Sequence, residues 1–144
     1  MTDKSDSAQR FVVLLHEVGP QFMRTTETHL DWLFESGEAL TTWSTKVVTD
    51  FGTSFELSCH QLPDHRLIYL DREGEIGGGR GSVRRLLAGE FTHLKNISGD
   101  VAFHARLAWQ LDCDSRYARV EITQRRLGTE RDFEPAFELR FSSE

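Results

Sequence analysis

The hydrophobic positions of this chain recur mostly with a period of two, which is typical of β-strands. Residues 11–15 form an apolar, partly β-branched run that ends at His16 and predicts a buried strand. From His29 to Glu35, the even positions are all apolar. The odd positions are polar or charged except for Leu33. In residues 101–111, hydrophobic residues occupy every second position: Val101, Phe103, Ala105, Leu107, Trp109 and Leu111. No stretch keeps a 3.6-residue apolar period over three turns, so we expect no long helix.

The same pattern predicts several further short strands separated by turns. The expected strands are 39–45, 55–59, 65–70, 82–87, 91–95, 117–124 and 136–141, with turns at 36–38, 88–90, 96–100 and 112–115. Gly74 to Gly81 holds five glycines, which fit neither a stable helix nor a plain strand. We expect loops at 17–27 and 125–135 and a disordered polar tail at 1–9. The prediction is an all-β fold: one closed or nearly closed β-barrel of about eight to ten short strands, formed by residues 10–144 as a single domain.

Composition and charge narrow the function classes. The 144 residues, 38% of them hydrophobic, suit one globular domain, and two cysteines fit a reducing compartment without excluding a disulfide. No apolar run approaches the ~20 residues that span a bilayer, and the N-terminus lacks the apolar core of a signal peptide. We therefore expect a cytoplasmic protein with no membrane partner. The net charge of −6 argues against a general nucleic-acid coat, but residues 66–95 carry six Lys/Arg against four Asp/Glu. This basic stretch suits either an anionic substrate or a solvated strand face.

His29 and Asp31 are the first candidates for chemistry. On a strand, residues two apart leave the same face, so an imidazole and a carboxylate would lie side by side. This is half of a divalent-metal site, which a second His from a neighbouring strand would complete; the alternative is a surface His beside a surface Asp. Imidazole plus carboxylate suits Mn²⁺, Fe²⁺ or Zn²⁺ better than Mg²⁺ or Ca²⁺. We interpret His60, His93 and His104 as structural.

Three stretches resemble a known family. They are RFVVLLHE (10–17), HLDWLFESGEALTTWST (29–45) and LPDHRLIYLDREGEIGGGRGSVRRLLAGEF (62–91). In order, they hold a strand ending in His, a His-x-Asp strand, a Leu/x-x-Trp strand, Asp-His-x-x-x-Tyr and a Gly-rich segment opening Glu-Gly-x-Ile. This combination resembles the 3′-phosphoesterase domain attached to bacterial DNA ligase D, and the stand-alone relatives of that domain. The resemblance covers about residues 11–91.

The resemblance implies both a site and an activity. It implies a β-barrel in which His16, His29 and Asp31 bind Mn²⁺, while His65 and Tyr69 reach the phosphate. The implied activity is removal of a 3′-phosphate or a 3′-ribonucleotide from 3′ ends of DNA or RNA in DNA repair. Ligase or end-joining proteins are the implied partners, and we expect a monomer.

The chain departs from the family pattern at one position that bears on activity. Active members place an Arg two residues after the metal-ligating Asp, where this chain has Leu33, and an apolar side chain cannot bind phosphate. Leu33→Arg should then raise activity if the pocket is otherwise that of the family. Arg80, Arg84 and Arg85 are candidate replacements for the missing phosphate contact. The alternative function is a catalytically weak or inactive module that binds metal and nucleic-acid ends.

A second alternative comes from another reaction class. Iron/2-oxoglutarate oxygenases also use His-x-Asp with a distant His, followed by Arg-x-Ser, and Arg80-Gly81-Ser82 matches that pattern. The short interval between His29 and His65 and the surrounding residues fit the phosphoesterase better.

Overall fold

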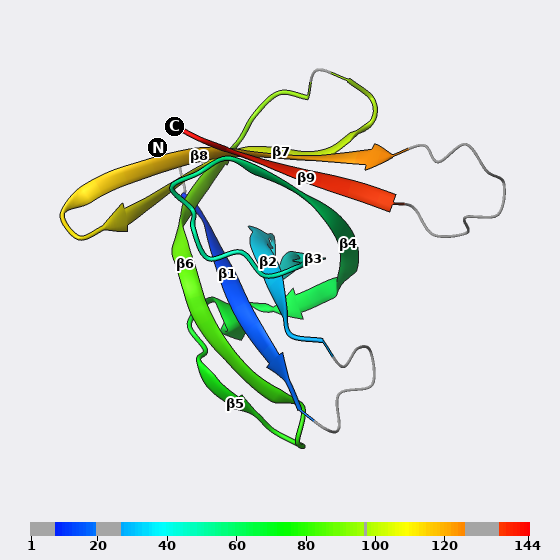
Figure 1. Cartoon of the computed structure of the whole chain (residues 1–144), viewed down its shortest axis with the longest axis vertical. Helices are drawn as coiled ribbons and strands as arrows, with labels where there is room; N and C mark the ends of the chain where they lie inside the picture. Colours follow the sequence, from blue (N-terminus) through cyan, green and yellow to red (C-terminus); the bar gives the residue numbers. More distant parts are fainter. Residues whose placement is uncertain (1–7, 20–26, 97, 126–135) are drawn as a thin grey trace, which may run out of the picture.

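The protein folds as one antiparallel β-sheet that closes on itself (Figure 1). The computed structural model describes residues 8–19, 27–96, 98–125 and 136–144. The strands are β1 (Gln9–Val18), β2 (His29–Ser36), β3 (Ala39–Thr45), β4 (Phe55–Arg66), β5 (Gly74–Ile76), β6 (Gly81–His93), β7 (Val101–Leu111), β8 (Asp114–Arg125) and β9 (Ala136–Ser143). A short 3₁₀ helix, η2 (Leu67–Leu70), follows β4.

The strand order is β1-β2-β3-β4-β9-β8-β7-β6-β5, and β1 also pairs with β6. Within the described residues this closes a barrel of eight antiparallel strands, with β5 added on the edge of β6. The predicted all-β barrel is therefore confirmed. Among the described residues, no helix is long and apolar enough to cross a membrane.

Two hydrophobic clusters divide the core. The interior cluster draws on all eight barrel strands, so it fills the barrel; it includes Phe11, Val13, Leu15, Leu30, Trp32, Phe34, Trp43, Phe91, Leu107 and Phe141. The outer cluster consists of Val12, Leu14, Leu33, Leu40, Leu70, Ile76 and Val83. Because its members alternate with interior residues along β1 and β2, it lies on the outer face of the barrel, where η2 and β5 cover it.

Two predicted elements were wrong. Residues 65–70 are not a strand, because β4 continues through Pro63 to Arg66 and the chain then turns into η2. Residues 88–90 are not a turn, because β6 runs unbroken from Gly81 to His93. A side chain at Gly89 would collide with the carbonyl oxygen of Ala108 on β7. The glycine thus permits close approach of two strands rather than a change of direction.

Gly74–Ile76 forms the short edge strand β5, although its glycines predicted no plain strand, and Glu17 and Val18 belong to β1 and not to the predicted loop. Further predictions are confirmed or lie outside the described residues. The turns at 36–38 and 112–115 join β2 to β3 and β7 to β8, and the strand at 101–111 has the predicted bounds. The polar tail falls almost wholly in 1–7, and the two long loops fall mainly in 20–26 and 126–135, none of which the structure describes.

Candidate metal centre

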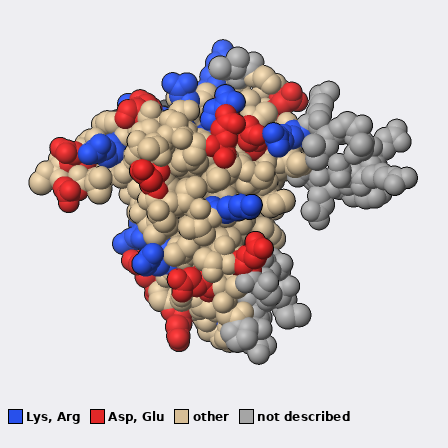
Figure 2. Space-filling model, in the orientation of Figure 1, with Lys and Arg blue, Asp and Glu red and all other residues tan. Residues whose placement is uncertain are grey.

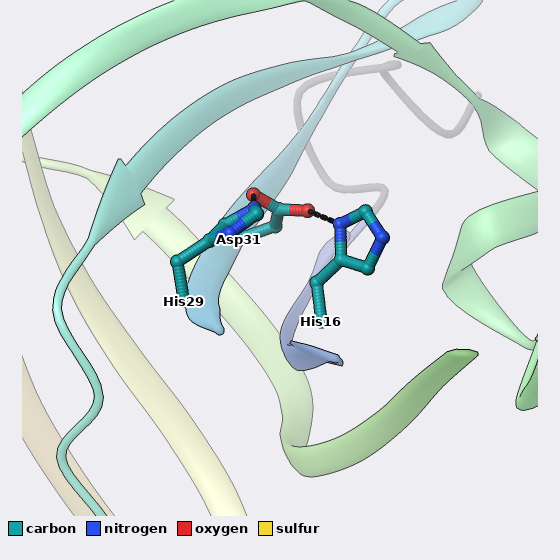
Figure 3. Close-up of side chains that lie close together, drawn as sticks. All are labelled: His16, His29 and Asp31. Atoms are coloured by element: carbon teal, nitrogen blue, oxygen red, sulfur yellow. Dashed lines mark ion pairs between the residues drawn. The ribbon is translucent and has the colours of Figure 1, made fainter. Parts of the chain in front are cut away.

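The strand register brings the three predicted ligands together on the outer face of the barrel. His16 on β1 pairs directly with His29 on β2, and Asp31 follows two residues later on the same face. Asp31 Oδ2 lies 3.6 Å from His16 Nδ1, and Asp31 Oδ1 lies 3.1 Å from His29 Nε2. One ligand atom from each residue falls within 4.8 Å of the others, and all three side chains are buried (Figure 3). The cluster can therefore hold a metal ion.

Backbone carbonyls orient both imidazole rings. His29 Nδ1 lies 3.0 Å from the carbonyl oxygen of Glu27, and His16 Nε2 lies 3.3 Å from that of Arg80. A carbonyl can only accept, so these two nitrogens carry protons, and the other nitrogen of each ring faces Asp31. Two ring nitrogens and a carboxylate thus converge on one buried point. When protonated, these nitrogens donate hydrogen bonds to the carboxylate; when deprotonated, they can turn lone pairs toward a metal ion.

The carboxyl of Asp31 carries its negative charge at neutral pH. Burial alone would raise its pKa, but hydrogen bonds from His16 and His29 and the charges of His29 and His65 outweigh burial. Together they lower the pKa of Asp31 to about 2. Since metal ligands must be deprotonated to bind, this carboxylate is ready to coordinate.

A small cavity opens beside the cluster. Its volume is about 50 Å³. It is lined by Leu14, His16, Asp31, His65, Tyr69, Ile76, Arg80 and Val83. One water needs roughly 10–15 Å³, so the cavity accepts an ion and a few oxygen-sized groups. A small oxygen-rich group such as a phosphate suits a cavity of this volume.

His65 and Tyr69 lie together in the wall of this cavity. The ring centroids are 5.5 Å apart, with the rings edge to face. His65 lies near the end of β4 and Tyr69 lies in η2, so a helical turn, not one continuous strand face, brings them together. His65 Nδ1 lies 3.1 Å from both the Pro63 carbonyl and Thr42 Oγ1. His65 therefore carries a proton on Nδ1, which leaves its Nε2 available to groups in the cavity.

Thr42 is a site residue that the sequence did not reveal. Its hydroxyl donates to the carbonyl of Leu40 at 3.0 Å, so its oxygen is turned to accept from His65. The side chain is fully buried. Thr42 and His65 lie on neighbouring strands of shifted register, and no local spacing in the sequence indicates that contact.

The three arginines proposed for phosphate binding separate in the structure. Arg80 lines the cavity, and its Nε donates to the Gly77 carbonyl at 2.8 Å. Arg85 lies on the outer face but is engaged by the Leu70 carbonyl and by Glu73. Arg84 pairs with Leu15 of the interior cluster, so it projects from the opposite face of the sheet. Only Arg80 is thus brought to the metal cluster.

Leu33 lies on the outer face, as predicted, but it does not line the cavity. It is fully buried in the outer cluster, in register with Val12 on β1 and Thr42 on β3. An Arg at this position would have to pass through apolar neighbours to reach a phosphate. The gain of activity expected from Leu33→Arg therefore meets a packing obstacle.

No protein-family model matches this chain, and no curated protein matches it significantly in sequence. The structure defines a β-barrel with a buried His-His-Asp group that can hold a metal ion. The phosphoesterase family remains a resemblance carried by the residues quoted above.

Proposed function

We propose that this protein is a Mn²⁺-dependent phosphoesterase that removes a 3′-phosphate or 3′-ribonucleotide from ends of DNA or RNA. The observation that carries the proposal is the convergence of three buried potential metal ligands beside a cavity of about 50 Å³ that His65, Tyr69 and Arg80 also line. A cavity of this size suits the terminal phosphate of a strand. A role in DNA repair beside ligase or end-joining proteins is part of the same proposal.

The residues around the cavity have separate roles in the proposed ester cleavage. A divalent ion held by His16, His29 and Asp31 would supply the positive charge that polarises a phosphate oxygen. Water forms the new bond to phosphorus as the ester P–O bond breaks. His65 is oriented through Nδ1 by Pro63 and Thr42, so in the protonated ring Nε2–H would give its proton to the departing oxygen. The hydroxyl of Tyr69 and the guanidinium of Arg80 contribute hydrogen bonds to the remaining phosphate oxygens.

The proposal is tested with an end-labelled oligonucleotide that bears a 3′-phosphate, incubated with Mn²⁺. The wild-type protein should release phosphate, and His65→Ala should lower turnover by roughly 10²-fold, the usual scale for a lost acid or charge stabiliser. Mn²⁺ affinity should stay unchanged, because His65 is not part of the ligand group. His93→Ala, which changes an exposed histidine on β6, is the control and should retain full activity. Full activity of His65→Ala would contradict the assignment.

One observation favours a binding module instead. Leu33 stands where the family has a cation, and it is buried in the outer cluster, so Arg80 is the one arginine or lysine among the described residues that line the cavity. A missing charge-assisted contact typically costs ~1.5–3 kcal/mol. Metal-dependent binding of the same oligonucleotide without turnover would favour the module over the enzyme.

A further inference from the structure

A row of polar side chains leads away from the metal centre across three strands. Asp31 on β2 pairs with Ser44 on β3, and Ser44 pairs with His60 on β4. Directly paired residues of antiparallel strands share a face, so all three side chains lie on the outer face of the barrel. Neighbouring strands are about 4.8 Å apart, which places His60 roughly 10 Å from Asp31.

Burial decreases along this row. Asp31 is buried, Ser44 is half-buried and His60 is exposed. The residues that alternate with them, Trp43 and Cys59, belong to the interior cluster, which confirms the direction of the row. The row therefore forms a polar path from the buried ligands to the open surface.

The described residues that line the cavity come from the other strands and from η2. Ile76 of β5 and Val83 of β6 line it beyond β1, with Arg80 beside them. His65 and Tyr69 line it on the η2 side. Across β3 and β4, the described residues next to Asp31 are the small Ser44 and then the exposed His60.

The chemistry of the path suits a chain of phosphates. A serine hydroxyl and an imidazole N–H both donate hydrogen bonds, and the imidazole does so in either protonation state. Farther along the outer face of β4, the charge of Glu56 is engaged by Arg140, with Arg140 Nε 3.0 Å from Glu56 Oε1. On the face shown in Figure 2, basic and acidic side chains are interleaved, which fits recognition of one strand end better than coating of a duplex.

We propose that the strand carrying the reactive 3′ end leaves the metal centre over Ser44 and that His60 binds the next phosphate along it. The ligand of this site is then a polynucleotide and not a small phosphate ester, an inference that rests on the proposed function. Neither residue touches the reacting phosphate in this arrangement. Each should affect affinity for a strand and leave the chemical step unchanged.

The test compares two substrates in the presence of Mn²⁺: an oligonucleotide with a 3′-phosphate, and p-nitrophenyl phosphate, which has no strand. His60→Ala should raise KM for the oligonucleotide about 10-fold, the effect of losing one hydrogen bond to a charged group, with kcat unchanged. Its kcat/KM for p-nitrophenyl phosphate should equal that of the wild type. Ser44→Ala should show a smaller shift of the same kind, and His93→Ala should show none.

The outcomes separate this inference from the proposed function. Equal losses on both substrates would place His60 at the reacting phosphate, and turnover unaffected by His60→Ala on both would remove it from the site; either result overturns the inference alone. If neither substrate is turned over, the dissociation constant of the oligonucleotide with Mn²⁺ is measured instead. A 10-fold weakening in His60→Ala would then support the path while the phosphoesterase proposal fails, and absent or His60-independent binding would overturn the path as well.

Discussion

Strands β1 and β2 bury both of their faces, and the two faces are built for different purposes. Their interior face packs Phe11, Val13, Trp32 and Phe34 against rings from the rest of the barrel. The indole nitrogen of Trp32 is satisfied there, because Trp32 Nε1 donates to Thr45 Oγ1 at 2.9 Å. Their outer face mixes leucines with His16, His29 and Asp31 under the cover of η2 and β5.

The comparison separates residues that stabilise the protein from residues that bind. The interior face gains free energy from apolar burial and ring contacts. The outer face gathers two imidazoles and a carboxylate that can hold a cation, and burying such polar groups is costly unless they are paired or bind an ion. Buried polar residues on an otherwise apolar strand face therefore indicate a site, and changes to the two faces should have distinct consequences.

The largest expected effect on stability is in the interior. Trp32→Ala removes a fully buried indole and its hydrogen bond to Thr45, and it should lower the free energy of unfolding by about 3–5 kcal/mol. Urea denaturation of the variant and the wild type measures this difference. A decrease in the free energy of unfolding below about 1 kcal/mol would mean that packing around Trp32 contributes little to stability.

Leu33→Arg tests the apolar part of the outer face. The guanidinium would have to enter a cluster that contains Leu14, Leu40 and Leu70, so the free energy of unfolding should fall by about 2–3 kcal/mol. Activity on a 3′-phosphate end should not rise. Higher turnover with unchanged urea stability would instead restore the expectation drawn from the family resemblance.

The acid sensitivity of the metal-free protein tests the polar part of the outer face. The folded pKa of Asp31, about 2, lies below the ordinary value near 4, so its ionised form stabilises the fold. This contribution, about 2 kcal/mol, should be complete above about pH 4 and should be lost as the pH falls through 2. The difference in unfolding free energy between wild type and Asp31→Asn, measured without metal, should shrink over that window. A difference that is constant from pH 5 to pH 2 would contradict the lowered pKa.

The two cysteines compare the barrel interior with an exposed turn. Burial in the interior cluster raises the pKa of Cys59 to about 12, whereas Cys113 is exposed in the β7–β8 turn. At pH 8, an aromatic disulfide reagent should therefore titrate one thiol in the native protein and a second only after denaturation. Rapid reaction of both thiols in the native state would show that the interior opens.

The features that could be predicted correctly from the sequence are those that depend on a local pattern of residues. Period-two alternation was enough for the barrel class, for the strand at 101–111 and for the shared face of His29 and Asp31. Apolar content alone misassigned residues 65–70, because a strand also needs a hydrogen-bonding partner; in η2 only Leu70 is buried, and Ile68 is 53% exposed. Gly89 was misread because a glycine needed for close strand approach looks the same in sequence as one needed for a turn.

The rest of the site depends on contacts between distant parts of the chain. The pairing of His16 with His29 was anticipated only through the family resemblance, and the register of β1 and β2 now supplies its physical basis. The carbonyls of Arg80 and Pro63, the hydroxyl of Thr42 and the row through Ser44 to His60 follow from strand register and chain folding. Spacing along the sequence does not encode these contacts.

Calorimetric titration with Mn²⁺ tests the central claim, that His16, His29 and Asp31 form one metal site, most directly. The wild type should bind one ion per chain, and Asp31→Ala should bind at least about 10- to 100-fold more weakly because it loses the only anionic ligand. Asp71→Ala, which removes an exposed aspartate paired with Arg10, is the matched control and should bind like the wild type. Equal affinity in Asp31→Ala and the wild type, or no binding by the wild type, would contradict the claim.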